Sequence, residues 1–71
     1  MLVKELLRFL YFGTKVKFYE KEMLSLRNAR YLCEGIYKGD NVNEFLLERK
    51  VQAYYIENNT LNIVLYLESE V

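Results

Sequence analysis

The side chains of this chain best suited to bind a ligand are a group of cations interleaved with an aromatic ring: Lys15, Lys17, Tyr19, Arg27 and Arg30. Such a pattern suits a nucleic-acid backbone with a stacked base. It is also typical of an ordinary solvent-facing strand, where lysine discourages edge-to-edge aggregation. The 10 basic and 10 acidic residues of the chain cancel, whereas nucleic-acid-binding domains are usually basic. Nucleic-acid binding is therefore the alternative hypothesis.

The segment VQAYYIENNTLNIVLYLESEV at 51–71 predicts a β-hairpin that is apolar on both faces. Asn58 and Asn59 tolerate the positive φ of a two-residue turn, while a longer turn would shift the register by one and exchange the faces. With the two-residue turn, one face pairs Ile56 with Leu61, Tyr54 with Ile63 and Gln52 with Leu65. The second face holds Tyr55, Ala53, Val51, Val64 and Tyr66.

The sequence lacks the residues and motifs that common enzymes use in catalysis. It has no histidine, no glycine-rich phosphate loop and one cysteine, so we expect no catalytic, metal or cofactor site. Cys33 has apolar, strand-like neighbours, which favours a small core residue over a reactive thiol. A single cysteine also excludes an intrachain disulfide.

The elements that would position these residues follow from hydrophobic periodicity. Apolar residues at helical spacing predict an amphipathic helix over 2–11, ended by Gly13. Strict alternation predicts a strand around 14–21, and a second strand follows around 30–39, with a bulge or close backbone approach at Gly35. Asn41 and Glu44 have the spacing of a capping box, which predicts a short second helix before the closing hairpin.

This order predicts one α+β domain over 1–71, with the N-terminal amphipathic helix packed on a small, mainly antiparallel four-stranded sheet. One helix covers one face of such a sheet. The other face must close into a barrel, pack on the short helix and the 22–29 segment, or meet another chain. A homodimer through Tyr55, Val64 and Tyr66 is the expectation, because a 71-residue domain without disulfides has a thin margin of stability.

The first residues of the chain do not resemble a signal peptide. Lys4, Glu5 and Arg8 interrupt the stretch that a signal peptide would keep apolar, and no apolar run approaches the roughly 18–20 residues needed to cross a bilayer. We expect a cytoplasmic protein with a reduced thiol and no membrane partner.

The segments LLRFLYFGTKVKFYE, CEGIYKGD and FLLERKVQAYYIENNTLNIVLY, in this order, resemble short uncharacterised proteins of phages and mobile elements of Gram-positive bacteria. This chain departs from them in its longer KEMLSLRNARY connection. The resemblance implies a small non-enzymatic accessory protein that binds a host or phage protein, a class that includes inhibitors such as anti-CRISPR proteins. It carries over no functional residues.

Overall fold

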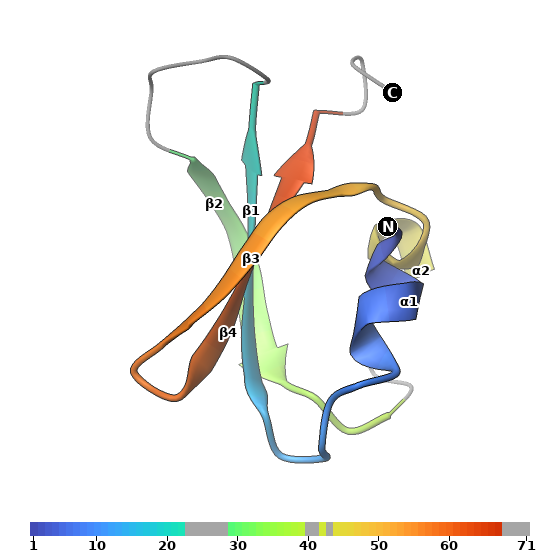
Figure 1. Cartoon of the computed structure of the whole chain (residues 1–71), viewed down its shortest axis with the longest axis vertical. Helices are drawn as coiled ribbons and strands as arrows, with labels where there is room; N and C mark the ends of the chain where they lie inside the picture. The colour runs from blue at the N-terminus through green and yellow to red at the C-terminus, as the bar shows by residue number, and fades with distance from the viewer. Residues whose placement is uncertain (23–28, 40–41, 43, 68–71) are drawn as a thin grey trace.

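Four strands form one sheet, and two short helices lie on one side of it (Figure 1). The computed structural model describes residues 1–22, 29–39, 42 and 44–67. The predicted element order and the α+β class are confirmed. The elements are α1 (Val3–Leu7), β1 (Lys15–Lys21), β2 (Arg30–Ile36), α2 (Glu44–Leu47), β3 (Val51–Glu57) and β4 (Thr60–Tyr66).

The sheet is mixed, with strand order β2-β1-β4-β3. The outer pairs β1–β2 and β3–β4 are antiparallel, as predicted, but the central strands β1 and β4 run parallel. This pairing places the two strands with alternating apolar residues side by side under α1, so that one helix can cover both. Strands β2 and β3 remain edges, so the barrel alternative is wrong.

The closing hairpin has the predicted turn, with φ of 54° at Asn58 and 58° at Asn59. Ile56 lies opposite Leu61 and Tyr54 opposite Ile63, as predicted. The predicted pairing of Gln52 with Leu65 is wrong, because the register shifts between Val51 and Ala53. Val51, not Gln52, lies opposite Leu65, because the bulge adds one residue to β3.

The bulge expected at Gly35 lies elsewhere in β2. Gly35 pairs regularly with Val16, and the register shifts where Tyr31 rather than Leu32 lies opposite Tyr19. Nothing lies within 4 Å of a Cβ built at Gly35, so no close backbone approach requires this glycine. Its neighbour Cys33 is exposed, which corrects the expectation of a core residue, because β2 is an edge strand.

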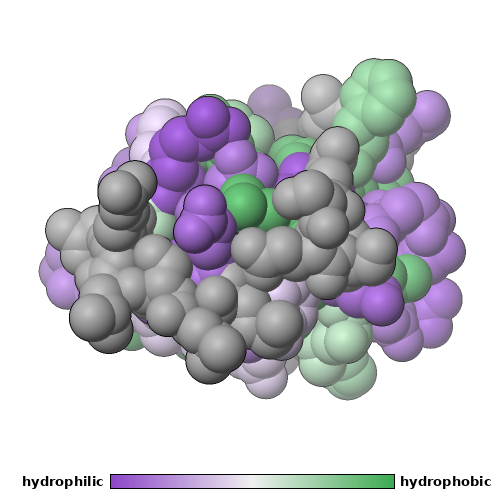
Figure 2. Space-filling model, turned by 90° about the horizontal axis from the view of Figure 1, so that it is seen from above, coloured by the Kyte–Doolittle hydropathy of each residue, from purple (hydrophilic) through white to green (hydrophobic). Residues whose placement is uncertain are grey.

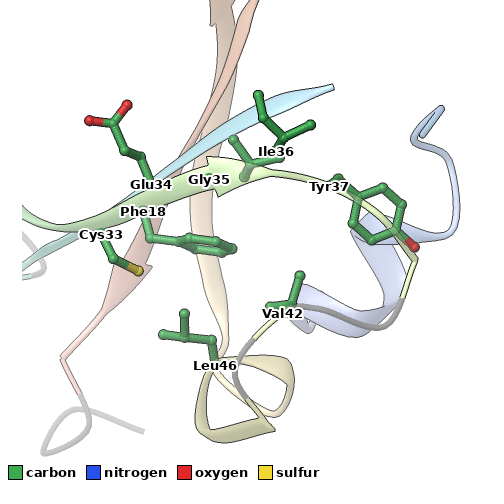
Figure 3. A pocket seen from close by; sticks show the side chains of 9 residues that line it. Phe18, Cys33, Glu34, Gly35, Ile36, Tyr37, Val42 and Leu46 are labelled. Atoms are coloured by element: carbon green, nitrogen blue, oxygen red, sulfur yellow. The ribbon is translucent and has the colours of Figure 1, made fainter. Parts of the chain in front are cut away.

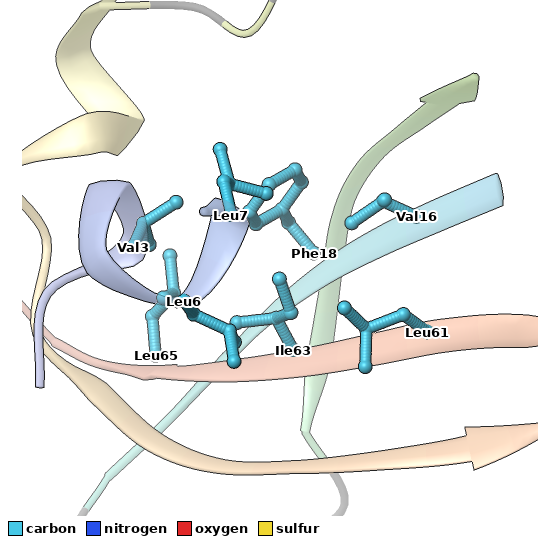
Figure 4. Packing of buried hydrophobic residues seen from close by; sticks show 8 residues of the cluster. All are labelled: Val3, Leu6, Leu7, Val16, Phe18, Leu61, Ile63 and Leu65. Carbon is cyan, nitrogen blue, oxygen red and sulfur yellow. The ribbon is translucent and has the colours of Figure 1, made fainter. Parts of the chain in front are cut away.

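The core lies between α1 and the two central strands (Figure 4). Val3, Leu6 and Leu7 point from the helix toward the sheet. They meet the buried side chains of Val16, Phe18, Leu61, Ile63 and Leu65.

The N-terminal helix has five residues, so the predicted amphipathic helix over 2–11 is wrong in length. Phe9, expected on its apolar face, is 79% exposed. Gly13 has the expected positive φ, 93°, but in the turn before β1, where its N–H donates to the Tyr37 carbonyl. Backbone bonds to the neighbouring strand end thus compete with continuation of the helix.

The second helix, α2, has four residues, and Leu46 and Leu47 pack against the edge of the core. Of the predicted capping pair, Asn41 lies outside the described residues, as does most of the 22–29 segment. None of the helices in the described part of the chain is long and apolar enough to cross a membrane.

Candidate protein-binding face

The side of the sheet opposite α1 and α2 receives side chains from all four strands, because residues paired across strands project to the same face. Lys17, for example, lies between Glu34 of β2 and Asn62 of β4. No helix of the described residues lies on this side (Figure 1). We call it the open face; it holds Lys15, Lys17, Tyr19, Lys21, Tyr31, Glu34, Ile36, Ala53, Tyr55, Glu57, Thr60, Asn62, Val64 and Tyr66.

All three residues predicted for a protein interface lie on the open face. Tyr55 is opposite Asn62, Val64 lies between Tyr19 and Ala53, and Tyr66 is opposite Lys21. Next to Val64, the rings of Tyr19 and Tyr31 meet edge to face with centroids 5.9 Å apart. Four tyrosines, contributed by four strands, therefore share one surface.

The residues predicted for nucleic-acid contact are only partly brought together. Lys15, Lys17 and Tyr19 lie on the open face. The Arg30 guanidinium instead donates to the carboxylate of Glu20, and Arg27 lies outside the described residues. Because the Arg30 guanidinium is paired with a carboxylate, it is less available to bind a phosphate group.

Glu34 is a fixed negative charge among the lysines of the open face. The Tyr31 hydroxyl donates to Glu34 Oε1 at 3.1 Å, and Lys15 Nζ lies 3.4 Å from Oε2. The hydrogen bond from Tyr31 and then that from Lys15 hold the pKa of Glu34 below its usual range. Desolvation first, and the bond to Glu34 second, raise the pKa of Tyr31. At neutral pH the carboxylate is ionised and the phenol is neutral.

A separate apolar pocket of about 290 Å³ lies between β2 and α2, on the helix side of the sheet (Figure 3). Its wall includes Phe18, Gly35, Leu46 and the Cys33 side chain. Desolvation raises the pKa of the Cys33 thiol, so the thiol is protonated at neutral pH and is a poor nucleophile. Among the described residues, no group of three or more Cys, Asp or Glu side chains could hold a metal ion.

Sequence reasoning missed a group of exposed aromatic residues after α1. Phe9, Tyr11 and Phe12 are all exposed, and Phe12 meets the Tyr37 ring edge to face at 5.8 Å. The signal was the segment FLYF, whose residues cannot all face the sheet once the helix ends at Leu7. Figure 2 shows the molecule from above, where small hydrophobic areas lie next to hydrophilic surface.

Comparisons of the chain with protein-family models, with curated proteins and with solved structures found no match. The open face carries four tyrosines and several charges around the buried side chains of Thr60 and Asn62, and no helix of the described residues covers it.

Proposed function

We propose that this chain is a small non-enzymatic protein that binds another protein through the open face. The observation that carries the proposal is the asymmetry of the sheet. One side is filled by the core under α1, and the other presents Tyr19, Tyr31, Tyr55 and Tyr66 without a described helix over them. Tyrosine is enriched at protein interfaces because its ring gives apolar contact area and its hydroxyl stays hydrogen-bonded.

The charges of the open face favour a protein partner over a nucleic acid. Glu34 and Glu57 lie among the lysines, and Lys15 is already paired with Glu34. Carboxylates at these positions would repel a phosphate backbone, whereas a protein can offer a cation to each. With the resemblance to phage and mobile-element proteins, this supports an accessory protein of the bacterial cytoplasm that blocks a host or phage protein, as anti-CRISPR inhibitors do.

A second candidate function, binding of single-stranded nucleic acid, is favoured by one observation. Lys15 and Lys17 are alternate residues of one central strand, roughly 7 Å apart, and Lys21 lies further along the same face. Neither Lys17 nor Lys21 has an ion pair within the described part of the chain. Tyr19 lies between them and offers a ring for a base.

Capture from a lysate of a Gram-positive bacterium tests the first candidate. The wild-type chain, Tyr66→Asp and the matched control Tyr11→Asp serve as baits, since Tyr11 is exposed but is not part of the sheet. We expect a protein held by wild type and by Tyr11→Asp and lost with Tyr66→Asp, then confirmed by direct binding of the purified partner. A partner retained equally by all three baits contradicts the open-face assignment.

A gel shift with short single-stranded RNA and DNA tests the second candidate. Nucleic-acid binding by this face would weaken steeply as salt rises and would weaken further in Lys17→Gln. A shift of this kind, without protein capture, would replace the first candidate by the second. We expect no salt-sensitive shift.

A further inference from the structure

We propose that two copies of the chain pair antiparallel through the outer edge of β3, which joins their sheets into one. This pairing uses the edge of the sheet and is independent of the function proposed for the open face. The inference rests on which apolar side chains the edge exposes, on the direction of its backbone groups and on the register that a two-fold axis allows.

The outer edge of β3 exposes a continuous apolar run. Tyr54, Tyr55 and Ile56 are 52%, 48% and 77% exposed, and Ala53 beside them is also exposed. Edge strands are usually protected by charges, proline or a bulge within the strand. In β3 the bulge lies before this run, between Val51 and Ala53, and the charged Glu57 lies after it, so the run itself has neither; β2 has its bulge and Glu34 within the strand.

The backbone of β3 directs unused groups outward at two of these residues. In a two-residue hairpin the residues flanking the turn, Glu57 and Thr60, bond to each other, and bonding alternates from there. Tyr55 therefore bonds inward to β4, while the N–H and C=O groups of Tyr54 and Ile56 point away from the sheet. The start of the same edge is already used, since Val51 N–H donates to the Met1 carbonyl at 2.8 Å.

A two-fold axis at Tyr55 satisfies all of these groups. It places Tyr54 opposite Ile56 of the second copy, and Ile56 opposite Tyr54 of the second copy, with four backbone hydrogen bonds. Both side-chain pairs combine an aromatic with a β-branched residue, a favourable cross-strand combination. Moving the register by two residues would place Tyr54 opposite Asn58 or opposite itself and lose both pairs.

The size of this contact fits a dimer that dissociates on dilution. The exposed parts of Tyr54, Tyr55 and Ile56 amount to about 350 Å² per copy, taking about 200 Å² for a fully exposed large side chain. A small specific interface buries about 600 Å² per partner, and the paired backbone supplies part of the difference. Packing of two open faces is less favourable, since it would bury Lys17 and Lys21 of both copies.

Sedimentation over a range of protein concentrations tests the edge contact. We expect wild type to reach twice the 8.6 kDa chain mass as the concentration rises. Ile56→Lys, at an exposed side chain that folding does not need, should raise the dimer dissociation constant at least about tenfold. Tyr66→Asp should leave it unchanged. A wild-type monomer at all concentrations, or a dimer split by Tyr66→Asp and not by Ile56→Lys, would overturn the proposal.

Cysteine crosslinking tests the register in a Cys33→Ser background. Two Tyr55→Cys chains would place their thiols next to each other on the axis, in a non-hydrogen-bonded pair whose Cβ atoms are close enough for a disulfide. Ala53→Cys is the matched control, because Ala53 lies opposite Glu57 of the second copy in this register. We expect a disulfide dimer on mild oxidation with Tyr55→Cys alone. Equal crosslinking of both variants, or crosslinking of Ala53→Cys alone, contradicts the register.

Discussion

Glu34 carries the strongest charge interactions on the open face, and its partners can be separated by substitution. Tyr31→Phe removes the hydroxyl that donates to Glu34 and leaves Lys15 in place. The pKa of Glu34 should then rise toward its usual value, because the hydrogen bond from Tyr31 is the largest influence that lowers it. NMR titration of the Glu34 carboxyl carbon measures this change, and an unchanged pKa would show that the lysines beside Glu34, Lys15 and Lys17, lower it without Tyr31.

The lowered pKa of Glu34 also determines how the stability of the fold changes with pH. Because the pKa of Glu34 is lower in the folded chain, its contribution is present above the unfolded pKa and is lost as pH falls through the folded pKa. Tyr31→Phe should reduce the amount of stability that is lost as the pH falls. The comparison is a pair of denaturation series at neutral and acidic pH.

Glu20 lies on the helix side of the sheet and forms a shielded ion pair. Its Oε2 atom is 3.2 Å from Arg49 Nη2, and the two side chains are only 13% and 12% exposed. Glu20→Gln removes the negative charge that contacts the guanidinium groups of Arg49 and Arg30, so we expect a loss of more than about 1 kcal/mol in the free energy of unfolding. Urea denaturation measures it. The matched control is Glu48→Gln, whose exposed pair with Lys4 should contribute less than about 1 kcal/mol; equal losses would contradict the account.

At the scale of single elements, hydrophobic periodicity predicted the strands and most of their faces but not their neighbours; Val51, predicted beside Tyr55, packs against the core because of the bulge. Alternation in β1 and β4 predicts which side chains share a side of each strand, and the Asn58-Asn59 turn predicts the pairing of β3 with β4. The parallel contact of β1 with β4 depends on the packing of α1 across both, which leaves no local signal. α1 ends at Leu7, earlier than the periodicity predicts, and the bond from Gly13 to Tyr37 then ties the segment after the helix to the end of β2.

Gly35 offers a test of the strand and pocket geometry. A Cβ at this position meets nothing within 4 Å, and the residue pairs regularly with Val16 beside an apolar pocket. Gly35→Val should therefore stabilise the fold by about 1 kcal/mol, through lower chain entropy when unfolded and better strand propensity. Thermal denaturation reports this as a higher Tm. Gly13→Val is the opposite control, because φ of 93° strains a β-branched residue and should lower the Tm.

At the scale of the whole molecule, the two proposed contacts use different surfaces that meet at Tyr55. Edge pairing of β3 would extend each open face into that of the second copy, so that a partner could be held at two sites with higher avidity. The sequence identified residues of the open face, Tyr55, Val64 and Tyr66 among them, from alternation alone. It could not place Lys17 and Tyr19 beside them, since this needs the parallel contact of two hairpins far apart in the chain.

Binding of a protein through the open face is tested most directly by NMR spectra of the ¹⁵N-labelled chain, recorded in buffer and in a clarified lysate of a Gram-positive bacterium freed of nucleic acid. We expect selective loss or shift of the amide signals of Lys17, Tyr19, Asn62 and Val64 on the two central strands, and unchanged signals for Leu6 and Leu7 of α1. Spectra identical in buffer and lysate, or changes confined to α1 and the exposed aromatic residues that follow it, would contradict the account.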